Sequence, residues 1–174
     1  ADPENYQAFC SLGIACKEES LFEKAVEAFM KSIEINDRFA LSWFHLAETC
    51  LSMNRFDEAR TFFNQVLSLS SSLSVEALIC QCEIELRCHR VDSFLAVCSR
   101  LLNIFKLDIK REIGSFEDIA IILIDIAYSV RENRKAVNRL TEMISLLSID
   151  SQKLIKNLLL IESEPDTEKI EFVS

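Results

Sequence analysis

This sequence predicts an all-α fold of stacked helix hairpins, and three observations support that prediction. The 174 residues include only 2 glycines and 2 prolines, whereas sheet-rich folds need turn residues roughly every 8 to 12 positions. Apolar residues recur at intervals of three and four, as on one face of a helix. The chain also matches itself when it is shifted by 34 residues, which indicates a repeat architecture. We therefore expect an α-solenoid of about four helix hairpins, followed by a C-terminal capping helix.

The first two hairpins are predicted at residues 5–36 and 38–70, where the self-match is strongest. The shift aligns Phe9 with Trp43, Leu12 with Leu46, Gly13 with Ala47, Cys16 with Cys50, Ala25 with Ala59 and Phe29 with Phe63. Small residues at 25 and 59 are expected where the helices of a hairpin cross, because a larger side chain would overfill the contact. Polar residues of the types that cap helix N-termini stand at the expected starts. These predicted caps are Ser20 with Glu23, Asn54 with Asp57, Asp37 and Ser74.

The aligned residues resemble the tetratricopeptide repeat (TPR) over residues 5–70. The residues that carry the resemblance are Trp43, Leu46, Ala47, Ala59 and Phe63, with Phe9, Leu12, Gly13, Ala25 and Phe29 one repeat earlier. The proline that often closes such a unit is replaced by Asp37 and Ser71. The resemblance implies a right-handed solenoid whose first helices line a concave surface and whose second helices form the outer surface.

The pattern continues with lower similarity through the rest of the chain. A shift of 35 predicts a third hairpin at residues 74–106, with Phe94 at the position of the small crossing residue, so this hairpin is expected to open or to shift its packing. Residues 105–114 break the period. A fourth hairpin is predicted at 115–148 and a capping helix at 151–162, with a loose acidic tail at 163–174.

A groove along the first helices is the predicted binding surface for a polypeptide. Counting from the aromatic or apolar anchor of each hairpin places an apolar row beside an acidic row. The predicted groove residues are Cys10, Ile14, Leu41, Phe44, His45, Glu48, Leu51, Ile79, Glu83, Leu86, Ile121 and Asp125. Apolar anchors would supply affinity and the carboxylates would fix register, so the expected ligand offers apolar and basic side chains. Phe44 is the best candidate for an energetic hot spot.

Two alternative interpretations of the groove stand beside this one. In the first, the acidic residues Glu48, Glu83 and Asp125 are solvated positions on exposed helix faces. In the second, the closing helix or the tail of the same chain fills the apolar row. The resemblance also disfavours one ligand: TPR domains that grip the C-terminal carboxylates of heat-shock chaperones use Lys, Arg and Asn. The matching positions here are Cys10, Ile14, His45, Glu76 and Cys80.

Charge and residue spacing disfavour several other functions. With 19 basic and 28 acidic residues the net charge is −9, which disfavours nucleic-acid and membrane-surface partners. The isolated Gly13 and Gly114 form no phosphate-binding loop. Seven cysteines, an odd number, are expected to be reduced in a cytoplasmic protein. No metal, cofactor or catalytic site is expected: Cys80 and Cys82 point away from each other on one helix, and Cys88 and His89 are sequence neighbours.

The predicted function is therefore a protein–protein interaction module without enzymatic activity. It is either a free adaptor or the repeat region of a larger protein, since the start Ala1-Asp2-Pro3 resembles a vector remnant. The alternatives are a small dedicated chaperone, similar to TPR-type secretion chaperones, and a scaffold that associates with itself.

Overall fold

The computed structural model describes residues 5–104, 122–124, 126–127 and 132–147. The chain divides into two compact units, Ala1–Ile104 and Phe105–Ser174, which are described separately. Every described residue that belongs to a regular element is helical. In this part of the chain no helix is both long and apolar enough to span a bilayer.

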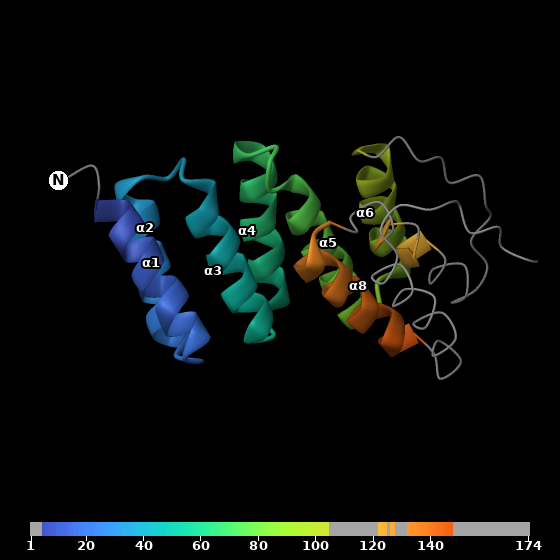
Figure 1. Cartoon of the computed structure of the whole chain (residues 1–174), viewed down its shortest axis with the longest axis horizontal. Coiled ribbons are helices and arrows are strands. Elements are labelled where there is room, and N and C mark those ends of the chain that lie inside the picture. The colour runs from blue at the N-terminus through green and yellow to red at the C-terminus, as the bar shows by residue number, and fades with distance from the viewer. Residues whose placement is uncertain (1–4, 105–121, 125, 128–131, 148–174) are drawn as a thin grey trace, which may run out of the picture. The chain divides into compact units, whose positions relative to one another are not determined.

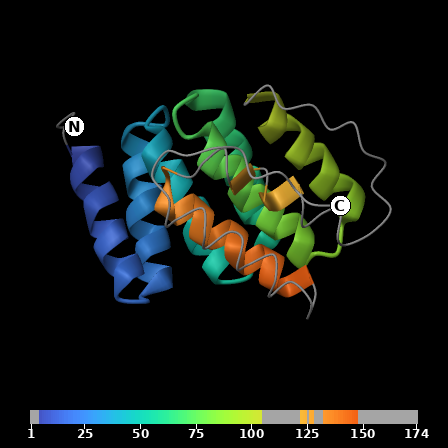
Figure 2. The same ribbon diagram turned by 45° about the vertical axis from the view of Figure 1, so that its right-hand side comes forward.

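The N-terminal unit consists of three antiparallel helix hairpins in succession (Figures 1 and 2). Its helices are α1 (Asn5–Glu18), α2 (Phe22–Ile35), α3 (Ala40–Ser52), α4 (Phe56–Leu69), α5 (Ser74–Arg87) and α6 (Val91–Ile104). The helix α2, for example, buries residues three or four positions apart, namely Ala25, Ala28, Phe29, Ser32 and Ile33. The all-α solenoid predicted from the sequence is confirmed.

The order of contacts gives this unit an inner and an outer side. Each of α1 to α5 contacts the next helix in the chain, and the first helices also contact one another, α1 with α3 and α3 with α5. Among these described helices, the second helices α2, α4 and α6 make no such contacts with one another. The first helices therefore form the closely spaced, inner side of the unit, and the second helices diverge on the outer side.

The turns inside the three hairpins share one left-handed conformation, which corrects the predicted capping boxes. Ser20, Asn54 and His89 have φ of 59°, 59° and 55°. The N–H of Ser20 donates to the carbonyl of Lys17, and that of Leu21 donates to the carbonyl of Cys16, which is the Schellman pattern of a helix C-terminus. Neither α2 nor α4 has a side-chain cap at its start. The prediction was wrong because Ser and Asn suit both a helix start and a left-handed turn.

The predicted caps of the first helices are also wrong. The residues that precede α3 and α5 are Phe39 and Leu73, and neither makes a side-chain capping hydrogen bond. Asp37 lies earlier, where its carbonyl accepts a hydrogen bond of 2.7 Å from the indole Nε1 of Trp43. Ser74 is instead the first residue of α5, and its hydroxyl donates to the carbonyl of Ser70.

The helix crossings of the three hairpins are filled in two different ways. In the first hairpin a Cβ added to Gly13 would lie 2.5 Å from the ring of Phe29, and the equivalent pair in the second is Ala47 and Phe63, both fully buried. The equivalent pair in the third is Cys82 and Cys98, whose Sγ atoms are 3.7 Å apart.

In the third hairpin the buried aromatic ring lies one helical turn earlier on the second helix than it does in the first two hairpins. Phe94, at the repeat position of Ala25 and Ala59, is fully buried. The side chain of Cys98, one turn later, is smaller than the phenylalanine found there in the other hairpins. The large and small residues have thus exchanged places, so the predicted shift in packing takes the form of an exchange on α6 that keeps a filled core.

The described part of the C-terminal unit contains α8 (Arg134–Leu147) and helical residues at 122–124 and 126–127. The side chain of Asn133 accepts a hydrogen bond from the N–H of Ala136, which caps the start of α8. Buried residues on α8 are Ala136, Val137, Leu140 and Met143. The predicted insertion at 105–114, the capping helix at 151–162 and the tail at 163–174 lie outside the described residues.

Candidate functional site

The predicted groove residues fall on the first helices, with different degrees of exposure. Cys10, Phe44, Leu51, Ile79 and Glu83 are buried, with at most 9% of their surface exposed. Ile14, Leu41, His45, Glu48 and Leu86 are half-buried. Ile121 and Asp125 lie outside the described residues. The half-buried residues are those with surface left for a partner, and the buried ones lie beneath that surface.

Phe44 is a core residue of the N-terminal unit. Its ring meets the ring of Phe63 edge-on at 5.8 Å between centroids, and that of His45 at 5.6 Å. Only 9% of its surface is exposed. Truncating Phe44 would therefore disturb packing between α3 and α4 as well as any binding, so other residues are better probes of the groove.

The half-buried Glu48 belongs to a charged cluster that joins α1 to α3. Lys17 Nζ lies 2.8 Å from Glu48 Oε2 and 3.3 Å from His45 Nδ1, and His45 Nδ1 lies 3.3 Å from the same carboxylate oxygen. The imidazole of His45 also stacks on Phe29 at 5.9 Å. Lys17 was not predicted as a site residue, because its contact with Glu48 depends on how successive hairpins stack. The charge of Glu48 is thus already balanced by a neighbouring repeat.

The second carboxylate of the predicted acidic row is also paired. Glu83 Oε1 lies 2.8 Å from Arg87 Nη2 one turn later on α5, and the side chain of Glu83 is 10% exposed. A basic partner would have to compete with Lys17 and Arg87 for these carboxylates. Specificity for basic side chains is accordingly a weaker expectation than the binding surface itself.

The buried thiols of this unit are structural groups. All seven cysteines, which lie between residues 10 and 98, are free. Burial raises the pKa of Cys50 to about 11, and the hydrogen bond to Cys98 together with burial raises that of Cys82. Neutral, buried thiols are poor nucleophiles and poor metal ligands. Within the described residues no cluster of three or more His, Cys, Asp or Glu side chains is placed to hold a metal ion.

A second hollow lies on the outer side of the same unit, between α4 and α6, and its residues were not predicted. It encloses about 400 Å³ and is lined largely by polar side chains, including Arg60, Glu85 and Arg100. Spacing along the sequence gave no signal for it, because it forms where two helices that are not neighbours in the chain diverge.

Comparisons with known proteins agree on the repeat. The tetratricopeptide repeat family model matches residues 6–39 and 40–72. The crystal structure of MamA is similar, with a TM-score of 0.58 and 14% identity over 94% of this chain and 81% of that one. A tetratricopeptide repeat protein from Parabacteroides merdae ATCC 43184 has a TM-score of 0.59 and 12% identity, over 94% of this chain and 58% of that one.

A third similar structure is that of YrrB, described as a TPR protein with an unusual peptide-binding site. It has a TM-score of 0.52 and 9% identity, over 90% of this chain and 86% of that one. At these identities the structures show a common fold. No curated protein matches the sequence.

Proposed function

We propose, from the premise that this chain belongs to the tetratricopeptide repeat family through residues 6–39 and 40–72, that it binds a polypeptide segment along its first helices. The observation that carries the proposal is the direct contact of α1 with α3 and of α3 with α5. These contacts join three helices into one continuous surface. The function is recognition of another polypeptide, without catalysis. A peptide-binding site in a protein of the same fold, YrrB, is consistent with this use of the fold.

The contact surface consists of the half-buried residues on this side. Ile14, Leu41 and Leu86 offer apolar contacts, and His45 and Glu48 offer polar ones. Apolar contact yields about 25 cal/mol per Å² buried, from which the cost of ordering the segment is subtracted. The proposed ligand is an extended or helical segment with apolar side chains, in which a Lys or Arg exchanges with Lys17 at Glu48.

Peptides selected from a random display library test the proposal. We expect Leu41→Ser and Leu86→Ser each to weaken the binding of a selected peptide by about tenfold, or about 1.4 kcal/mol. The matched control is Leu69→Ser, because Leu69 lies on the outer helix α4 and is 38% exposed. Circular dichroism of each variant would show that the helices are intact. Equal losses in all three variants would place the binding surface elsewhere.

Self-association is a second candidate function, favoured by exposed apolar residues at one end of the N-terminal unit. Leu12, Leu21, Met30 and Ile35 all belong to the first hairpin and are 37–52% exposed. Exposed apolar side chains on a terminal hairpin are a feature of surfaces that contact another chain. Light scattering across a range of protein concentrations would show a dimer that Leu12→Lys dissociates. A wild-type monomer at all concentrations would eliminate this candidate.

A further inference from the structure

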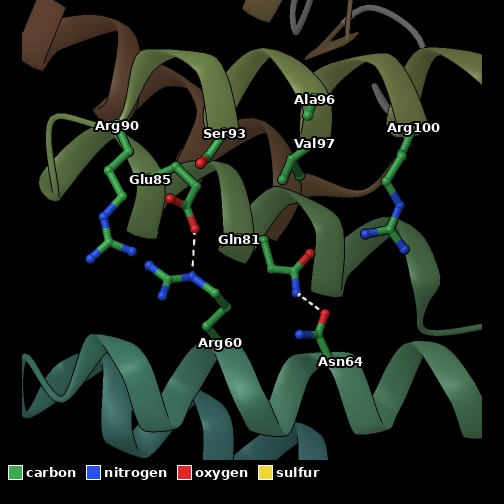
Figure 3. A pocket seen from close by; sticks show the side chains of 9 residues that line it. All are labelled: Arg60, Asn64, Gln81, Glu85, Arg90, Ser93, Ala96, Val97 and Arg100. Atoms are coloured by element: carbon green, nitrogen blue, oxygen red, sulfur yellow. Dashed lines mark hydrogen bonds and ion pairs between the residues drawn. The ribbon is translucent and has the colours of Figure 1, made fainter.

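The outer hollow between α4 and α6 is a polar pocket with its own geometry (Figure 3). Its floor is α5, and its two walls are α4 and α6, which do not contact each other. The lining residues are Arg60 and Asn64 on α4, Gln81 and Glu85 on α5, Arg90 at the turn, and Ser93, Ala96, Val97 and Arg100 on α6. Its volume of about 400 Å³ falls within the range of roughly 300–1,000 Å³ that ligand sites occupy.

Two buried polar atoms in this pocket have no partner. Arg60 Nε donates to Glu85 Oε1 at 2.6 Å, and Arg60 Nη1 donates to Asp57 Oδ1 at 2.8 Å. These bonds leave Arg60 Nη2 and Glu85 Oε2 unpaired, although both atoms are buried and Glu85 is only 3% exposed. A buried polar group without a partner is destabilising, because it loses its hydrogen bonds to water on folding.

The other lining residues of the pocket are also partly paired. Gln81 Nε2 donates to Asn64 Oδ1 at 2.8 Å across the seam between α5 and α4. This bond occupies one atom of each amide and holds the two side chains across the floor (Figure 3). Only Ala96 and Val97 are apolar among the nine lining residues. The pocket therefore offers polar and charged side chains beside the apolar surface of Ala96 and Val97.

The pocket is locally positive in an acidic protein. Its lining holds three arginines and one carboxylate, a net charge of +2, whereas the whole chain carries −9. Asp57, which bonds Arg60, reduces the local value to +1. Arg90 lies 3.9 Å from the exposed Asp57, and Arg100 forms no ion pair with any described residue. Figure 3 shows Arg90 and Arg100 at opposite ends of the pocket, with Arg60, Glu85 and Gln81 between them.

We propose that this pocket binds an acidic polypeptide segment. The carboxylates of the segment pair with Arg100 and Arg90, which are both exposed. These two residues are ten positions apart, which is about 15 Å along a helix. An extended segment of roughly five residues covers that distance. This site goes beyond the proposed function, because it lies on the outer side and takes a ligand of opposite charge.

A pentapeptide with acids at both ends is a direct probe. Acetyl-Glu-Asn-Ser-Ser-Glu amide would be titrated into the 15N-labelled full chain at constant ionic strength, and the arginine Nε–Hε signals followed by NMR. We expect the signals of Arg60, Arg90 and Arg100 to shift, with affinity reduced about tenfold or more for acetyl-Gln-Asn-Ser-Ser-Gln amide. If none of these signals shifts at millimolar peptide concentration, the proposal is overturned.

Variants of the chain separate this pocket from general charge effects and from the inner surface. Arg100 is exposed, so Arg100→Gln is expected to fold normally and to lose about tenfold in affinity. Arg38→Gln removes one equally exposed positive charge outside the pocket and is expected to bind like the wild type. Leu41→Ser, on the inner surface, is also expected to keep pentapeptide binding. If Arg100→Gln binds like Arg38→Gln, the pocket is not the site.

Discussion

Gly13 determines how closely α1 and α2 approach each other. An added Cβ would lie 2.5–2.8 Å from three ring atoms of Phe29, which is itself fully buried. A Gly-to-Ala change at an exposed helix position would stabilise the helix by about 1 kcal/mol. Here the overlap with the ring costs more, so the crossing needs a residue without a side chain.

We predict that Gly13→Ala lowers the free energy of unfolding by up to about 2 kcal/mol, because overpacking of about 1–3 kcal/mol exceeds the gain of about 1 kcal/mol in helix propensity. Urea denaturation would measure this change in the free energy of unfolding. The same substitution in a Phe29→Leu background should be neutral or stabilising, since the ring is absent. Equal effects in both backgrounds would mean that Phe29 is not the obstacle.

Ser20 and His89 adopt a backbone conformation that glycine adopts at lower cost. Both have left-handed φ values at equivalent turns, at a cost of about 1 kcal/mol for a residue with a side chain. We predict that Ser20→Gly and His89→Gly each raise the free energy of unfolding by roughly 0.5–1 kcal/mol. Ser11→Gly, within α1, should lower it by a similar amount. A destabilised Ser20→Gly variant would show that the hydroxyl, rather than the turn, matters.

Burial of the Cys50 thiol makes stability depend on alkaline pH. Desolvation, opposed by Arg55 and aided by Glu58, raises its pKa from 9.0 to about 11 in the folded chain. Below pH 9 the thiol is protonated in both states and its contribution is complete. Between the two pKa values the unfolded chain loses the proton and the folded chain keeps it, so the free energy of unfolding falls as pH rises.

The contribution of Cys50 is measured by comparing wild type with Cys50→Ala between pH 8 and 11. We expect the free energy of unfolding of the wild type to fall more steeply, by up to about 1.4 kcal/mol per pH unit. The contributions of the other titrating groups to the pH dependence cancel when one curve is subtracted from the other. Parallel curves would mean that the Cys50 thiol ionises equally easily in both states.

At the level of helices, the third hairpin shows how a repeat tolerates a large change. Its α6 carries Phe94 where α2 and α4 carry alanine, and Cys98 where they carry phenylalanine, and both residues are fully buried. Because the exchange conserves volume approximately, it keeps a filled core where either change alone would leave a cavity or a clash.

Restoring the arrangement of the other hairpins tests this exchange. Phe94→Ala alone is expected to cost about 3–5 kcal/mol, and Cys98→Phe alone about 1–3 kcal/mol. The double variant should be more stable than the sum of these losses predicts, by about 2 kcal/mol. The reverse exchange, Ala59→Phe with Phe63→Cys, is the matched control in the second hairpin. Additive losses would show that the two positions do not share one space.

The first two hairpins were predictable because each of these repeats carries its own apolar spacing and places a small residue at the crossing. Ala25 and Ala59 were identified as crossing residues from the alignment, and both are fully buried. The sequence predicted a change of packing at Phe94 but not the exchange with Cys98, because the repeat alignment compares one position at a time and does not show which positions share a space. The capping boxes were wrong because Ser20 and Asn54 match the composition of a cap while their φ values place them in a turn.

At the scale of the whole N-terminal unit, contacts between hairpins were less predictable than the hairpins themselves. The pairing of Lys17 with Glu48 joins residues 31 positions apart, and it depends on the stacking geometry of α1 and α3. The pocket of Arg60, Glu85 and Arg100 depends on the divergence of α4 and α6. The sequence predicted a binding surface on the first helices, but it did not show which of their residues keep exposed surface.

The central claim is that a polypeptide binds along the first helices. The most direct test is methyl NMR of the full chain with a peptide selected from a random library. We expect the largest shifts at the methyl groups of Ile14, Leu41 and Leu86, and unchanged signals from Ile35 and Leu69. The largest shifts at Ile35 and Leu69, with Ile14, Leu41 and Leu86 unchanged, would contradict it.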